Sequence, residues 1–233
     1  MKHKRVVIKV TGSLFDLDKN KELRELFKLV NFVKEIVLKN KMKIFMIVGG
    51  GRHLRDYLSI LRRRGVNESM LDRVGIELTR VNALILSSLL GDICCGVIPK
   101  SIDEALILQN FGNVVVMGGL IPGFSTNAVS ALIAEAINSD LLIIMSKAGA
   151  LYDKDPEKFK DAKPIKKAKI DDVRRILSQY WSKAGYYPLL DRTAIEIINR
   201  SKIPTVIIPP TVESLKKTLE GEYIGTLIVF DNR

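Results

Sequence analysis

Cysteine and histidine are scarce in this 233-residue sequence, which contains two of each. Cys94 and Cys95 are adjacent, so an ordinary disulfide between them is sterically implausible. With no disulfide framework, we expect a reducing, cytoplasmic location. His3 and His53 are too few and too widely separated to indicate a zinc site.

Long apolar runs are also missing. The longest, such as residues 44–48 and 141–145, are far shorter than the ~18 residues that span a bilayer. The first residues lead directly into a strand-like run, so we expect no signal segment and no membrane span. Aromatic residues make up only 6% of the chain, so its core must rest on Leu, Ile and Val. The 47% hydrophobic content excludes a disordered protein.

Acidic residues are outnumbered, with 26 Asp and Glu against 37 Lys and Arg and a formal net charge of +11. This excess favours an anionic partner, which includes phosphates, nucleotides, nucleic acid or a membrane surface. No basic stretch is interleaved with aromatic residues, so we expect no nucleic-acid binding. The compact cluster Arg62-Arg63-Arg64 is interpreted as a solvated helix end.

Apolar runs rich in Val and Ile alternate with segments of helical period, which predicts an α/β fold. Strands are predicted at residues 6–10, 43–48, 113–117, 141–145, 204–208 and 225–230. Helices are predicted at residues 22–40, 53–64, 71–90, 125–137, 170–179, 191–199 and 212–219. Strands that are apolar throughout indicate a mainly parallel sheet covered on both faces. Residues 152–170 are rich in Lys, Asp and Pro, so we expect a surface excursion or a soft boundary between two lobes.

Glycine turns follow three of the predicted strands. Gly12 follows the first strand, residues 49–51 follow the second, and Gly118 with Gly119 follow the third. Glycine allows close approach of the main chain to a ligand, and helix N-termini favour anions. Parallel sheets bind ligands at the carboxyl ends of their strands, so the three turns together predict a site for several phosphates. The alternative is that each turn needs glycine for its own geometry.

The glycine turns match neither of two common phosphate-binding motifs. No Gly-Lys-Ser/Thr follows a glycine at the Walker A spacing. The run Gly49-Gly50-Gly51 lacks the G-x-G-x-x-G order of dinucleotide-binding folds.

Several polar residues near these turns are candidates for binding or catalysis. Lys9 lies inside an apolar strand and is predicted to meet a phosphate, unless that strand is an edge strand facing solvent. Arg55 lies one helical turn after Gly51, near the same anion site, or is a solvated surface residue. Asp72 accepts ribose hydroxyls, or complements a helix dipole as a first-turn acid. The polar residues Arg80 and Asn82 interrupt an apolar helix and suggest an internal interface or site.

These residues occur in an order that resembles a known family. The segment Lys9-x-x-Gly12-Ser13 is followed by Gly51-x-x-x-Arg55, Asp72-x-x-Gly75, Gly119-x-x-Pro122-Gly123-x-Ser125-Thr126 and Tyr152-x-x-Asp155-Pro156. The series resembles the archaeal-type uridylate (UMP) kinases of the amino acid kinase superfamily over nearly the whole chain. The resemblance implies one three-layer αβα domain over residues 1–233, with an acceptor lobe to about residue 140 and an ATP lobe from about 141.

The resemblance also implies the reaction, partners and site residues. The family transfers the γ-phosphoryl group of ATP to UMP with Mg²⁺ and assembles as homohexamers. By position, Lys9 and Arg55 are the catalytic residues, with Lys9 between the two phosphate groups. The residues implied to bind ATP are Gly12, Ser13, Gly51, Arg55, Ser146, Lys147, Tyr152 and Asp155. The residues implied to bind UMP are Gly50, Asp72, Leu120, Ile121, Pro122, Gly123, Phe124, Ser125 and Thr126, and no metal ligand is identified.

The sequence departs from the family at positions that bear on catalysis. Gly149 and Asn127 stand where family members commonly have aspartate, Lys147 replaces asparagine, and Leu120 replaces threonine. Two alternatives to UMP phosphorylation therefore stay open. One is a kinase for another small phosphate or carboxylate acceptor, and the other is a nucleotide-binding or storage assembly with weak or no catalysis.

Overall fold

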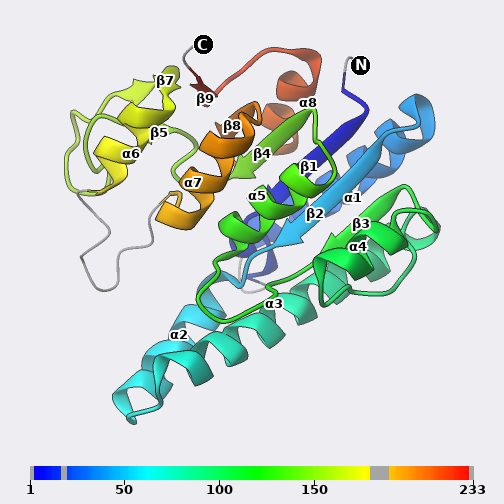
Figure 1. Cartoon of the computed structure of the whole chain (residues 1–233), viewed down its shortest axis with the longest axis horizontal. Helices are drawn as coiled ribbons and strands as arrows, with labels where there is room; N and C mark the ends of the chain where they lie inside the picture. Colours follow the sequence, from blue (N-terminus) through cyan, green and yellow to red (C-terminus); the bar gives the residue numbers. More distant parts are fainter. Residues whose placement is uncertain (1–2, 17–19, 179–188, 231–233) are drawn as a thin grey trace.

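A seven-stranded sheet forms the centre of the molecule in the computed structural model, which describes residues 3–16, 20–178 and 189–230 (Figure 1). In spatial order the strands are β3 (Val114–Met117), β2 (Lys43–Val48), β1 (Arg5–Val10), β4 (Leu141–Met145), β8 (Thr205–Ile208), β9 (Thr226–Val229) and β7 (Lys167–Lys169). Every neighbouring pair is parallel except β8 with β9, which is antiparallel. The prediction of a mainly parallel sheet is confirmed.

Helices cover both faces of the sheet. One face is covered by α1 (Asn20–Asn40), α3 (Glu68–Leu90) and α8 (Val212–Glu220). The opposite face is covered by α4 (Ile102–Leu108), α5 (Thr126–Ala136), α6 (Ile170–Ser178) and α7 (Arg192–Ser201). The strands are apolar on both sides because their alternate residues enter two separate cores: Val6 and Ile8 enter one, and Val7 enters the other. The αβα sandwich is therefore confirmed.

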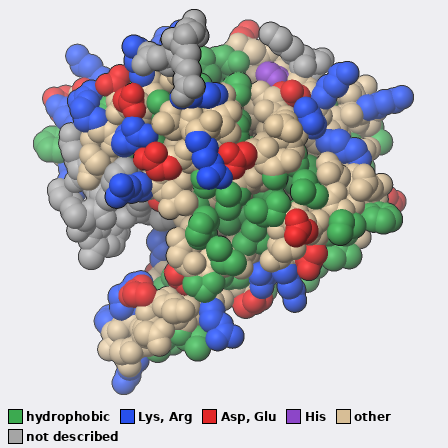
Figure 2. Space-filling view, in the orientation of Figure 1, with side chains coloured by type: hydrophobic (Ala, Val, Ile, Leu, Met, Phe, Trp, Pro, Cys, Tyr) green, Lys and Arg blue, Asp and Glu red, His purple; other side chains and the backbone are tan. Residues whose placement is uncertain are grey.

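Helix α2 (Gly51–Arg63) projects from this sandwich together with the beginning of α3 (Figure 1). None of its 13 residues is buried. The projecting arm carries basic side chains at its end in Figure 2, and the sequence there includes Arg62-Arg63-Arg64. This agrees with the interpretation of that cluster as a solvated helix end.

The segment from residue 152 to residue 170 is mainly a surface excursion, as expected, but it is not without structure. Strand β5 (Leu151–Tyr152) pairs with β6 (Pro164–Ile165) in a small separate sheet. Strand β7 then joins the edge of the main sheet beside β9. Sequence reasoning also missed α4 and the 3₁₀ turns η1 (Gly12–Phe15) and η2 (Gly91–Ile93), because short segments carry little periodic signal. Gln179, the last residue of the helix predicted at residues 170–179, lies outside the described residues.

One described helix, Glu68–Ile93, is long and apolar enough to cross a membrane by length and composition. The core helix of a globular domain meets the same criterion, and its inward residues Ala83, Leu86 and Leu90 are buried against the sheet. Length and composition therefore do not separate the two explanations for this helix.

Candidate active site

Lys9 lies on β1, the strand between β2 and β4, so the edge-strand alternative is wrong. It is two residues after Val7 and therefore faces the α5 side of the sheet, near the carboxyl end of the strand. Its side chain is only 5% exposed. Burial lowers the pKa of Lys9 to about 8, and the positive charge of nearby Arg55 lowers this pKa as well. Two cations thus converge where an anion would stabilise both.

The first two glycine turns pack directly against each other. A Cβ atom added to Gly12 would lie 2.0 Å from the Gly51 nitrogen and 2.6 Å from the Gly49 carbonyl oxygen. Gly49 also donates its N–H to the Val10 carbonyl at 3.0 Å. At Gly12, glycine is therefore required for contact between chain segments, as the geometric alternative held. This contact brings the ends of β1 and β2 together beside Lys9.

The beginning of α2 is held by a residue that the sequence did not point to. The Arg52 N–H donates to Oδ1 of Asp16 at 2.8 Å, and Asp16 is only 3% exposed. This N–H is therefore not free for a phosphate, which corrects the expectation of an open helix N-terminus. The contact spans 36 positions in the chain, so no local capping motif could have revealed it.

Helix α3 holds the second and third glycine turns by one polar face. Thr79 Oγ1 accepts the Gly119 N–H at 2.7 Å, and Asn82 Nδ2 donates to the Gly49 carbonyl at 2.9 Å. About two turns before Thr79, Asp72 Oδ2 accepts the Gly123 N–H at 2.8 Å. Helix α3 begins at Glu68, so Asp72 is not a first-turn acid as one alternative required. The expectation that Asn82 lies at an internal interface or site agrees with its contact to the second glycine turn.

The loop that precedes α5 carries the residues expected to bind UMP. Leu120, Phe124 and Ser125 are half-buried, Thr126 is buried, and Ile121, Pro122 and Gly123 are exposed. Ser125 caps α5 by accepting the N–H groups of Asn127 and Ala128 at 3.0 and 3.1 Å. Its hydroxyl donates to Asp191, which caps α7. The N-terminus of α5 is therefore also partly satisfied by side-chain contacts.

The residues expected to bind ATP fall into two groups. The first group lies at the first two glycine turns and consists of Gly12, Ser13, Gly51 and Arg55. Gly50, which is expected to bind UMP, lies in the same turn as Gly51. Ser146 joins them at the same sheet edge, because β4 pairs with β1 and ends one residue before it. Lys147 follows and is exposed.

Tyr152 and Asp155 form the second group, on the β5–β6 excursion. Asp155 is 3% exposed; its Oδ1 accepts the Glu157 N–H at 3.0 Å, and its Oδ2 lies 3.5 Å from Lys158 Nζ. These contacts support the local role of Asp155 in its loop, and its contact with ATP stays a prediction.

A model of the amino acid kinase family matches residues 4–209 of this chain. The chain belongs to the amino acid kinase family. The uridylate kinase of Methanobrevibacter smithii is 38% identical over 230 residues, 97% of this chain and 99% of that protein. The uridylate kinase of Methanocaldococcus jannaschii is 36% identical over 224 residues, 96% of this chain and 99% of that protein.

Solved structures agree with this assignment. The crystal structure of uridylate kinase from Archaeoglobus fulgidus superposes with a TM-score of 0.84 at 32% identity, covering 96% of this chain and 99% of that one. The UMP kinase of Bacillus anthracis, at 22% identity and a TM-score of 0.77, shows the same fold. The family and the αβα architecture expected from the sequence are both confirmed.

The depressed pKa of Lys9 gives this protein a testable stability profile. The folded chain holds this proton less tightly than the unfolded chain, so the Lys9 contribution to stability rises between pH 8 and its ordinary pKa of 10.5. One pKa unit corresponds to about 1.4 kcal/mol. We expect Lys9→Met to be more stable than the unmodified chain by up to a few kcal/mol at pH 7, with the difference shrinking towards pH 10.5. Urea unfolding of both proteins at pH 7 and pH 10 measures this, and a constant difference would refute it.

Proposed function

We propose that this member of the amino acid kinase family phosphorylates UMP, transferring the γ-phosphoryl group of ATP to give UDP and ADP in pyrimidine nucleotide synthesis. The observation that carries the proposal is the convergence of Lys9 and Arg55 at the glycine turns of a chain that matches archaeal uridylate kinases along almost its entire length. Phosphoryl transfer depends mainly on positioning and on neutralising charge, and these residues supply both.

Each part of the site has a role in this reaction. Lys9 is placed between the ATP and UMP phosphates, where its ammonium group stabilises charge that shifts from donor to acceptor oxygens. Arg55 binds the ATP phosphates, and Lys147 adds an exposed cation on the same side. Helix α3 presents Asp72 and holds the loop at residues 119–126 through Thr79 and Asp72. UMP is thereby held at a fixed position relative to the glycine turns. The 1–140 and 141–233 parts then act as acceptor and ATP lobes of one domain.

Mg²⁺ is proposed to act with ATP. Among the described residues, no group of three or more His, Cys, Asp or Glu side chains is placed to hold a metal ion. Asp16, Asp72 and Asp191 are engaged with backbone N–H groups. These side chains do not form a metal cage, whereas Mg²⁺ commonly keeps substrate phosphates and waters as its ligands. We assign no reaction step to a protein-held metal.

A phosphate-acceptor panel tests the proposed reaction. ADP release is measured with ATP and each of UMP, CMP, AMP, a small isoprenoid phosphate and a small carboxylate. The proposal predicts that UMP gives the highest kcat/KM. Transfer to another acceptor with none to UMP would contradict it and favour the kinase alternative.

One observation favours the second alternative, a nucleotide-binding or storage assembly. Asn127, which stands where aspartate is common, is 1% exposed, and its Oδ1 has no hydrogen-bond partner among the described residues. An amide cannot supply the charge of a carboxylate at this buried position. Calorimetric binding of ATP and UMP, measured beside ADP release, separates the two functions, because tight binding without turnover would favour the assembly.

Asp72 provides a prediction for UMP binding. If its carboxylate accepts the ribose hydroxyls, Asp72→Asn weakens UMP binding by about 1–3 kcal/mol, the range for a charge-assisted hydrogen bond. ATP binding is expected to change little, because the Asp72 carboxylate contacts Gly123 in the loop proposed to bind UMP. Calorimetry with each nucleotide measures this. Glu68→Gln, one turn earlier in α3, is the matched control, and equal losses for both nucleotides would assign Asp72 a purely structural role.

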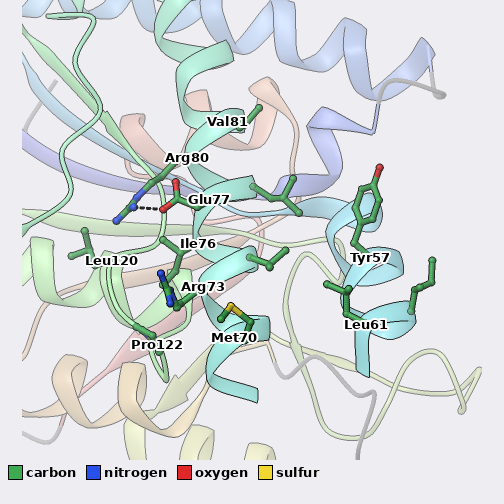
Figure 3. A pocket seen from close by; sticks show the side chains of 13 residues that line it. Tyr57, Leu61, Met70, Arg73, Ile76, Glu77, Arg80, Val81, Leu120 and Pro122 are labelled. Carbon is green, nitrogen blue, oxygen red and sulfur yellow. Dashed lines mark hydrogen bonds and ion pairs between the residues drawn. The ribbon is translucent and has the colours of Figure 1, made fainter. Parts of the chain in front are cut away.

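A homohexamer is proposed, with copies meeting on an exposed apolar groove along α2 and α3 (Figure 3). This groove has a volume of about 730 Å³, and Tyr57, Met70 and Val81, three of the residues that line it, are 57%, 42% and 52% exposed. Apolar patches of this kind commonly mark protein interfaces. Arg80 lies at its border, paired with Glu77 at 2.7 Å.

The assembly is tested by a charge in the groove. Val81→Glu is expected to shift the mass in analytical ultracentrifugation from a hexamer to smaller species. Leu38→Glu is the control, since Leu38 is 71% exposed on α1 and does not line this groove. An unchanged mass for Val81→Glu would exclude the groove as an interface.

ATP and UMP are the partners of the proposed enzyme, and a cytoplasmic location suits both its substrates and its unpaired cysteines. We propose no nucleic-acid partner and no membrane association.

A further inference from the structure

The position of Arg55 depends on how α2 is attached to the rest of the molecule. Arg55 lies in the second turn of a helix without a single buried residue. The apolar residues Leu54, Leu58 and Leu61 of this helix are only half-buried, so polar contacts at the first turn have a large share in fixing where the helix starts. Yet the Arg55 charge lies close enough to Lys9 to affect that buried lysine. The contacts at the first turn of α2 therefore contribute to the geometry of the two cations.

Asp16 makes the polar contact at this first turn. It ends η1, the 3₁₀ turn that follows β1, and its own N–H donates to the Ser13 carbonyl at 3.2 Å. Its Oδ1 accepts the Arg52 N–H at 2.8 Å, three residues before Arg55. The same oxygen borders Gly51, where an added Cβ would approach it to 2.9 Å. Asp16 thus joins the strand that carries Lys9 to the helix that carries Arg55.

The chemistry of this contact favours a carboxylate. Helix N-termini carry partial positive charge, and an ionised acceptor there forms a stronger hydrogen bond than a neutral one. Asp16 is 3% exposed, so water cannot readily replace it as the partner of the Arg52 N–H. Losing this acceptor releases the first turn of α2, and displacements of about 1 Å at a reacting centre can cost about 100-fold in rate.

We propose that Asp16 is a positioning residue of the phosphoryl transfer: it holds the first turn of α2 so that Arg55 stays beside Lys9 and the ATP phosphates. This inference rests on the proposed kinase function for its effect on turnover. Asp16 acts through Arg55 and contacts neither nucleotide.

A double-mutant cycle tests the proposal, with kcat for UMP phosphorylation and the Kd of ATP without UMP as separate readouts. We expect Asp16→Ala to lower kcat and to weaken ATP binding by about 10-fold or more, and Arg55→Ala to do at least as much. The double variant is expected to be no more impaired than Arg55→Ala alone, because both changes remove the same interaction. Asp16→Asn keeps an acceptor oxygen and is expected to recover most of the loss.

Asp140→Ala is the matched control, because the Asp140 carboxylate also caps β1 backbone, accepting the Lys4 and Arg5 N–H groups at the opposite end of the strand. It is expected to lower the melting temperature without changing kcat. The proposal would be overturned if the losses in kcat and ATP affinity were additive in the double variant. It would also be overturned if Asp16→Ala left the ATP affinity unchanged. If the unmodified chain binds ATP but does not phosphorylate UMP, the proposed function fails, and the ATP-affinity cycle still decides whether Asp16 positions Arg55.

Discussion

Replacing Lys9 with methionine is expected to lower kcat by about 100-fold or more, which corresponds to ~2.7 kcal/mol of transition-state stabilisation. The Lys9 side chain is buried on the α5 side of the sheet, where its charge is costly unless an anion is near. In the proposed reaction the transferring phosphoryl group is that anion, and attraction to it is greatest while charge shifts between donor and acceptor. The loss therefore falls on kcat more than on nucleotide affinity. Steady-state kinetics with ATP and UMP measure the effect.

Lys43→Met is the matched control for this change. Lys43 opens β2, and its ammonium group donates to the Gln109 and Gly112 carbonyls at 2.7 and 2.9 Å. Lys43→Met should therefore lose stability and keep its kcat, whereas Lys9→Met should lose kcat and gain stability. Near-normal turnover in Lys9→Met would contradict the role of Lys9, and Arg55 or Lys147 would become the better candidate for the cation between the phosphates.

Gly12→Ala is expected to lower kcat/KM by about 100-fold or more, the cost of a displacement of about 1 Å at a reacting centre. It is also expected to destabilise the fold by about 1–3 kcal/mol, the usual cost of forcing atoms into a packed site. The new methyl group would overlap the backbone of Gly51 and Gly49, at 2.0 and 2.6 Å, and backbone cannot rotate away as a side chain does. The ends of β1 and β2 must separate, which moves α2 and both predicted phosphate-binding turns. Kinetics and thermal unfolding together measure the two losses.

Gly75→Ala serves as the comparison for this substitution. It lies inside α3, where an added Cβ would only meet Leu54 side-chain atoms at 3.8 and 3.9 Å. Alanine favours a helix interior by up to about 1 kcal/mol, so the melting temperature should hold or rise. If Gly12→Ala behaved like Gly75→Ala, the contact between the two turns would not be part of the site.

The secondary structure of the sandwich could be predicted because its signals are local. The apolar runs that form β1, β2 and β4 and the helical period of α1 gave elements within about two residues of those observed. Helix α3 begins three residues earlier than predicted, because Asn67 caps it by accepting the Met70 N–H. Asparagine is a favoured capping residue, so that start was available in the sequence.

The parts of the site that could not be predicted depend on the spatial order of the strands and on contacts between distant segments of the chain. Periodicity does not specify strand order, so Lys9 could be assigned either to a central or to an edge strand until β1 was seen between β2 and β4. The partners of Asp16 and Asn82 lie 32 to 36 positions away in the chain, beyond any local motif. Conversely, the alternation of glycine turns with strands did predict that the turns lie at one edge of the sheet, because parallel strands bring their carboxyl ends together.

A crystal structure with UMP and a non-hydrolysable ATP analogue tests the central claim most directly. The account predicts that the UMP phosphate and the analogue's γ-phosphate lie on either side of the Lys9 ammonium group, with Arg55 on the analogue and Asp72 on the UMP ribose. Nucleotides bound with their phosphates away from Lys9, or with Lys9 in contact with neither, would contradict it.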